Sequence, residues 1–265
     1  MFTLPQNHTT STAGIPIVVI PESTENLRTL LLFCHPGTTP DPPSSLERFY
    51  YLHRIADKYM LESILTWLRK GCLPGFLETM PVGVYVLARQ LGWKAEARLA
   101  AKRCLSLSVS ELAAWSSPLL QDVSASFLQE LFKYHQECAK FLSDAMSIHP
   151  WAHEWCYSPD YANTIHFRAK EEDCCKEPHE LGPELRYIYT KTWWNVFISE
   201  CSEALAKVPS FEKIPVAEIF CKVAKVAGRC ADCGPLALER LAEFSKVNQG
   251  PVLIRLDQAV PVPVG

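Results

Sequence analysis

The sequence predicts a mostly helical α+β protein, and three observations lead to this fold class. Hydrophobic residues recur along most of the chain with the spacing of one helix face. Prolines and glycines stand where helices commonly begin and end. The clearest strand candidate is the short β-branched run at 15–20, which lies between Gly14 and Pro21 and whose lack of alternation predicts burial on both faces.

The first two predicted helices lie at 22–35 and 44–70. Leucines recur at helical spacing in the first, and the prolines between 36 and 43 end it. Ser44 or Ser45 caps the second helix, which ends in the stretch 71–75 with its two glycines. The expected core of this region is Leu30, Leu31, Ile55 and Ile64.

A helical extension is predicted next. Segments 81–92 and 94–104 read as an antiparallel helical hairpin, whose second helix carries a stripe of small residues that allows close packing. Ser108 and Glu111 have the spacing of a capping box, and 122–146 is the most strongly amphipathic stretch. Expected core positions here are Val86, Ala97, Ala100 and Leu131.

The remaining sequence predicts a loop-rich insertion at 147–182 and then three helices at 183–208, 215–228 and 235–247, with Phe197 and Phe220 buried. A short terminal strand is expected at 252–256, after the pair Gly250 and Pro251. The predicted domains are therefore 1–75, a helical extension at 76–146, the insertion at 147–182 and a C-terminal helical region at 183–265.

Composition and charge exclude several classes of protein. A formal net charge of −3 gives no overall electrostatic reason to bind nucleic acid or acidic membranes. No apolar run approaches the ~20 residues needed to span a bilayer, and the opening residues lack the pattern of an export signal. We therefore expect a cytoplasmic or nuclear protein whose 11 cysteines are mostly reduced.

The sequence lacks the patterns on which common catalytic sites are built. It contains no G-x-S-x-G, no phosphate-binding glycine loop and no dinucleotide-binding fingerprint. His149 and His153 do not form a hydrolase zinc motif, because Pro150 disfavours helical geometry and HExxH is absent. A non-enzymatic protein is expected.

Cysteine spacing suggests a structural zinc site. Cys230 and Cys233 form a C-x-x-C pair between two predicted helices, a geometry that can present two thiolates to one ion. His153 and Cys156 are the candidates for the two further ligands, and the pair at 174–175 offers at least one more thiolate. The alternative is that these are reduced cysteines that fill helical cores and loops; a redox C-x-x-C would need a preceding strand.

Several phrases in order along residues 1–115 resemble BTB/POZ domain proteins of mushroom-type fungi. They are MFTLPQ at 1–6, IPIVVIPES at 15–23, LLLFCHPG at 30–37, ADKY at 56–59 and VYVLARQLGWKAEARLAA at 84–101. The resemblance implies that 15–20 is a sheet strand and that 46–70 forms late helices of that domain. The implied fold is a truncated BTB/POZ-like half with one main strand, followed by a helical extension.

The same resemblance implies a function in protein–protein interaction, as a ubiquitin-ligase adaptor for a cullin-type scaffold or as a transcriptional scaffold. A BTB/POZ domain carries a strand hairpin and two helices before the position matched by Met1, and the family's dimers are built on those elements. Family-type homodimerisation is therefore not expected here. A zinc-stabilised structural protein using Cys230 and Cys233, or a non-functional remnant, are the alternatives.

Overall fold

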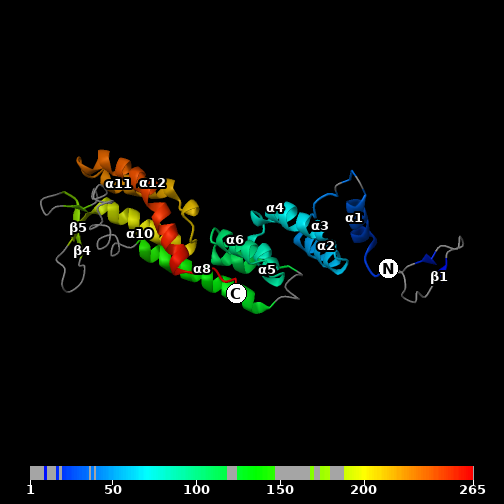
Figure 1. Cartoon of the computed structure of the whole chain (residues 1–265). Helices are drawn as coiled ribbons and strands as arrows, with labels where there is room; N and C mark the ends of the chain where they lie inside the picture. Colours follow the sequence, from blue (N-terminus) through cyan, green and yellow to red (C-terminus); the bar gives the residue numbers. More distant parts are fainter. Residues whose placement is uncertain are drawn as a thin grey trace. The chain divides into compact units, whose positions relative to one another are not determined.

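The computed structural model describes residues 9–10, 16–17, 20–35, 37–38, 40–117, 124–146, 168–169, 174–179 and 188–264 (Figure 1). Helices dominate these residues, as the sequence predicts. The chain divides into two compact units between Phe76 and Leu77, and each unit is described by itself.

The first unit contains a short hairpin and four helices among its described residues. Strands β1 (Thr9–Thr10) and β2 (Pro16–Ile17) pair antiparallel. The helices are α1 (Thr24–Cys34), α2 (Leu46–Lys58), α3 (Glu62–Trp67) and, after a π-helical turn at Leu68–Cys72, α4 (Leu73–Leu77). The described residues of the predicted strand at 15–20 are 16–17, which form β2, and Ile20, which is exposed, so the expected burial was wrong at that end.

Local sequence explains where α1 and α2 begin. The hydroxyls of Ser23 and Ser45 accept hydrogen bonds from the backbone N–H groups of Asn26 and Arg48, and each thereby satisfies a donor that a helix start leaves unpaired. The buried hydrophobic side chains of this unit include Leu30, Leu46, Phe49, Leu52, Ala56, Ile64, Leu68 and Leu73.

The expected burial of Leu31 was wrong. Leu30 is 4% exposed, whereas Leu31 is 59% exposed. Neighbouring residues of a helix point about 100° apart, so only one of the two can lie at the centre of a single buried stripe. Leu30 takes that position on α1, and Thr29 on its other side is buried as well, so the stripe extends away from Leu31. Ile55 is half-buried rather than fully buried, while Ile64 is buried as predicted.

The second unit begins with the predicted helical hairpin. Helices α5 (Pro81–Gln90) and α6 (Lys94–Cys104) pack against each other, and Gly92 turns the chain between them with a φ of 70°. The small residues of α6 (Ala97, Ala100, Ala101 and Cys104) are all fully buried. Helix α7 (Val109–Ala114) starts with the capping box of Ser108 and Glu111, and α8 (Ala125–Ala145) follows.

The remaining described residues of the second unit contain a small sheet and three helices. Strands β3 (Arg168–Ala169), β4 (Lys176–His179) and β5 (Ile188–Lys191) form an antiparallel sheet in the order β3-β5-β4. They precede α10 (Thr192–Lys207), a 3-10 turn at Phe211–Lys213, α11 (Val216–Ala227) and α12 (Cys233–Ala259). Helix α10 packs against α8 and α11, and α12 packs against α11 and α8.

Two predictions for this region were wrong. Residues 188–191 form β5, the central strand of the sheet, instead of the start of a helix, and the buried Thr190 hydroxyl donates to Asn195 at 2.6 Å. Residues 252–256 continue α12 instead of forming a strand, so the proline at 251 does not end the helix. Burial of Val86, Ala97, Leu131 and Phe197 is confirmed, and Phe220 is half-buried.

Among the described residues, no helix is both long enough and apolar enough to span a bilayer.

Candidate metal centre

The turn between α11 and α12 presents the first pair of cysteines. Helix α11 ends at Ala227, Cys230 lies in the turn, and Cys233 is the first residue of α12. The N–H of Cys230 donates to the Ala227 carbonyl at 3.0 Å, and the N–H of Gly234 donates to the Cys230 carbonyl at 3.1 Å. Backbone hydrogen bonds therefore fix the positions from which both side chains extend.

Cys174 and Cys175 form the second pair, directly before β4. Cys175 has a φ of 51°, in the left-handed region, and its carbonyl accepts hydrogen bonds from both the N–H and the hydroxyl of Thr192. The Lys191 ammonium donates to the Cys174 carbonyl at 3.1 Å. The junction of β5 and α10 thus holds the backbone of this pair in place.

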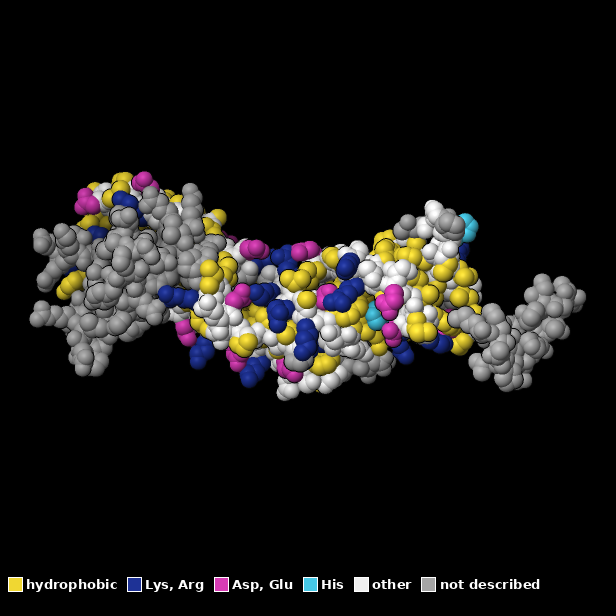
Figure 2. All heavy atoms as spheres, viewed as in Figure 1, with side chains coloured by type: hydrophobic (Ala, Val, Ile, Leu, Met, Phe, Trp, Pro, Cys, Tyr) yellow, Lys and Arg dark blue, Asp and Glu magenta, His cyan; other side chains and the backbone are white. Residues whose placement is uncertain are grey.

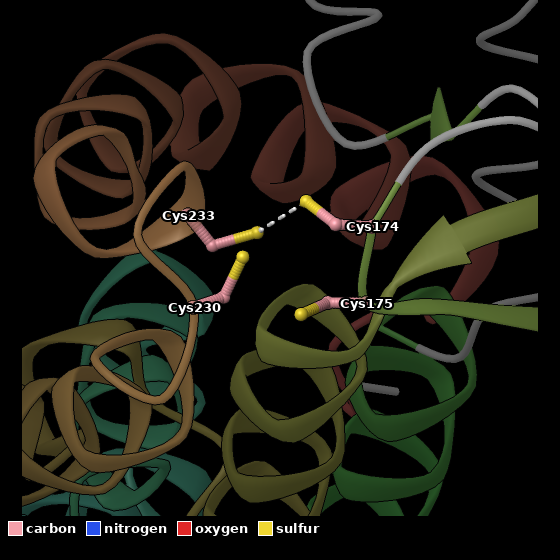
Figure 3. A group of neighbouring side chains, drawn as sticks. All are labelled: Cys174, Cys175, Cys230 and Cys233. Atoms are coloured by element: carbon pink, nitrogen blue, oxygen red, sulfur yellow. Dashed lines mark hydrogen bonds between the residues drawn. The ribbon is translucent and has the colours of Figure 1, made fainter.

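The two pairs meet with all four sulfur atoms within 4.8 Å of one another. Figure 3 shows the side chains of Cys230 and Cys233 facing those of Cys174 and Cys175 across a shared space. The Sγ atoms of Cys174 and Cys233 lie 3.7 Å apart, and the four cysteines are free thiols. A tetrahedral zinc ion with Zn–S bonds of ~2.3 Å needs sulfur–sulfur separations of about 3.8 Å, so small side-chain adjustments suffice.

The surroundings of the four thiols differ. Cys233 is buried, Cys174 and Cys230 are half-buried, and Cys175 is exposed. Hydrogen bonds from the backbone of Cys233, and next from the thiol of Cys174, lower the pKa of Cys230 to about 7. Burial raises the pKa of Cys233 to about 12. A divalent metal displaces such thiol protons when it binds, because the thiolate is the ligand.

A positive charge lies beside the cluster. The Lys191 ammonium is 4.0 Å from the Cys174 sulfur. Four thiolates around one Zn²⁺ carry a net charge of −2, which a neighbouring ammonium partly offsets. The chemistry of the donor set therefore fits a soft or borderline metal such as zinc, in a closed site with four protein ligands.

The predicted zinc ligands are brought together only in part. Cys230 and Cys233 belong to the cluster, and both Cys174 and Cys175 complete it, where at least one was expected to contribute. His153 and Cys156 lie outside the described residues. The adjacency of Cys174 and Cys175 was the signal for the second pair, but nothing in the sequence indicated that both sulfurs face the C-x-x-C turn.

Other cysteines fill helical cores instead. Burial raises the pKa of Cys72 to about 11, and the pKa values of Cys104, Cys138 and Cys201 to about 12. Such thiols stay protonated at neutral pH and pack as small hydrophobic groups. The inert role considered for the cysteines in general therefore applies to these four.

Comparisons with protein-family models, with curated proteins and with solved structures find no match to this chain.

Proposed function

We propose that the chain is a non-enzymatic protein interaction module whose second unit is stabilised by one zinc ion on Cys174, Cys175, Cys230 and Cys233. The observation that carries the zinc site is the convergence of these four thiols within 4.8 Å. Four cysteine ligands leave no open coordination position for water or substrate, which is the arrangement of a structural rather than a catalytic site.

Zinc at this position would connect two parts of the chain that are distant in sequence. Cys174 and Cys233 are 59 residues apart, one beside the β4–β5 sheet and the other at the start of α12. The small sheet has few buried groups of its own, because only Thr190 is buried among its described side chains. A metal cross-link supplies the stability that such a sheet lacks.

The metal content of the purified chain tests this proposal. Protein prepared without chelators should contain one zinc per chain by elemental mass spectrometry, and Cys230→Ser combined with Cys233→Ser should remove it. Cys221→Ser is the matched control, because Cys221 is an exposed cysteine of α11 outside the cluster. Sub-stoichiometric zinc in the unaltered chain, after zinc was supplied during expression, would contradict the proposal.

An exposed hydrophobic face on α1 supports a second proposal, that the first unit binds a protein partner in the manner of BTB/POZ domains. Leu27, Leu31 and Leu32 line a shallow groove on this helix, with Arg28 and His35 also contributing. Figure 2 shows hydrophobic side chains gathered over α1. With the resemblance of residues 1–115 to BTB/POZ proteins, a cullin-type ligase scaffold is the partner that we propose.

Leu31→Asp tests the second proposal because it changes the groove without entering the core. We expect the thermal midpoint of unfolding of the first unit to stay within about 4 °C, since exposed substitutions cost at most ~0.5 kcal/mol. Capture of the chain by immobilised cullin should fall at least ten-fold. Tyr51→Asp, at an exposed position of α2, is the control and should bind as the unaltered chain does. Equal capture of all three proteins would show that α1 does not contribute to cullin binding.

A further inference from the structure

Two side chains of α5 converge on a single backbone carbonyl from a distant part of the chain. The Tyr85 hydroxyl donates to the carbonyl of Pro263 at 3.1 Å, and Nη1 of Arg89 donates to the same oxygen at 2.8 Å. Tyr85 and Arg89 are four residues apart and therefore lie on one face of the helix. This donor pair is a recognition element for a peptide carbonyl.

The donor pair is held in position by groups other than its ligand. Nη1 of Arg89 also donates to Glu130 of α8 at 2.6 Å and to the Tyr85 hydroxyl at 2.9 Å. The guanidinium lies 4.5 Å from the centre of the Phe127 ring, where a cation is attracted to the aromatic face. Tyr85 is 0% exposed and the Arg89 side chain is 9% exposed. Such a site is preorganised for binding.

The carbonyl belongs to residues 260–264, which we call the Val-Pro segment (Val-Pro-Val-Pro-Val). The segment follows α12, and residues 261–264 are neither helix nor strand. Its two prolines have no N–H and hold φ near −65°, so the segment loses little entropy on binding and brings few donors that must be satisfied. Val260, at the start of the segment, is buried.

We propose that Tyr85 and Arg89 form a binding site for an extended, proline-alternating peptide, and that the Val-Pro segment is its built-in occupant. The donors recognise a main-chain carbonyl in a proline-rich context, and that chemistry is not unique to residues 260–264. A partner protein with an extended X-Pro-X-Pro stretch therefore binds here by displacing the Val-Pro segment. No atom of this site belongs to the cysteine cluster, so the inference goes beyond the proposed zinc site and can fail independently of it.

A labelled peptide with the sequence of residues 258–264 probes the site on the full chain. In the unaltered chain the segment competes at the high effective concentration of an intramolecular ligand, so we expect weak binding by fluorescence polarisation. Pro261→Gly combined with Pro263→Gly raises the entropy cost of seating the segment without placing a charge in the core. This variant should bind the peptide at least ten-fold more tightly than the unaltered chain.

Two further variants decide whether the bound peptide occupies the proposed site. Adding Arg89→Lys to the glycine variant should weaken peptide binding at least ten-fold, because an ammonium cannot reproduce the guanidinium contacts to Glu130 and the carbonyl. Arg98→Lys, at an exposed position of α6, should leave binding unchanged. Circular dichroism confirms that each variant is folded.

The proposal would be overturned if the folded glycine variant bound the peptide no more tightly than the unaltered chain, or if Arg89→Lys left that binding unchanged. A peptide with both prolines replaced by glycine should bind at least ten-fold more weakly than the parent. Equal binding of the two peptides would also contradict the proposal, because the site would then bind a main-chain carbonyl whether or not prolines flank it. Loss of zinc through Cys230→Ser does not alter Tyr85 or Arg89, so the two proposals are tested by different readouts.

Discussion

Replacing Cys230 and Cys233 together with serine should lower the midpoint of thermal unfolding of the zinc-loaded chain by about 10 °C or more. Structural zinc contributes apparent free energies on the order of 10 kcal/mol in small zinc-dependent peptides. Even ~4 kcal/mol of lost stability shifts the midpoint by roughly 8–16 °C in a unit of this size. The loss should be measured by calorimetry or by circular dichroism at matched zinc concentration.

A chelator provides the internal control for this experiment. Chelation should lower the midpoint of the unaltered chain toward that of the double variant and should leave the double variant almost unchanged, because the two treatments remove the same ion. Cys221→Ser should behave as the unaltered chain in both conditions. If the chelator shifts all three proteins equally, or none, the thiols at 174, 175, 230 and 233 do not hold a stabilising metal.

Acidification should weaken zinc binding before it affects the helices. Zinc binding releases thiol protons, so affinity falls as the pH falls and protons compete for the same sulfurs. The buried Cys233, with its pKa raised to about 12 in the metal-free chain, must lose its proton when zinc binds. The zinc-dependent part of the stability is thus present at neutral and higher pH and is lost toward acidic pH.

Local sequence signals predicted the helices that depend on short-range interactions. The α5–α6 hairpin follows from a proline at a first turn, a glycine that accepts a positive φ and a stripe of small residues. The capping box of Ser108 and Glu111 is present as expected. These features involve residues only three or four positions apart, so the sequence alone contains the information that determines them.

Features that depend on distant partners could not be predicted in the same way. The leucine spacing of α1 predicted that both Leu30 and Leu31 face the core, and the packing of the first unit buries Leu30 but leaves Leu31 exposed. Gly250 and Pro251 indicated a break, yet α12 continues through them. Strand β5 pairs with β3 and β4, which lie in a stretch where the sequence has no sustained period.

In the candidate metal centre, too, the local feature could be predicted from the sequence and the long-range one could not. The spacing of Cys230 and Cys233 is a local signal and identified half of the ligand set. The choice of their partners depends on which loop the fold brings to the α11–α12 turn, across 59 residues of sequence between Cys174 and Cys233. His153 and Cys156 offered equally suitable ligand atoms, so chemistry alone could not decide between the two pairs.

Ala100→Arg should unfold the second unit or cost it about 4 kcal/mol or more. Ala100 is 0% exposed in the face of α6 that packs against α5, where the neighbouring small residues are also fully buried. An arginine there must push the two helices apart or bury an unpaired charge, and each of these alone costs several kcal/mol. Native domains have free energies of unfolding of only about 5–15 kcal/mol, so a loss of this size removes much of the stability of the second unit.

The preceding residue supplies the control for this variant. Leu99 is 58% exposed on the same helix, so Leu99→Arg introduces the same side chain into the same turn and should change the free energy of unfolding by no more than about 0.5 kcal/mol. Urea denaturation followed by circular dichroism compares the two proteins. Similar midpoints for both variants would mean that Ala100 does not lie in a closely packed face of α6.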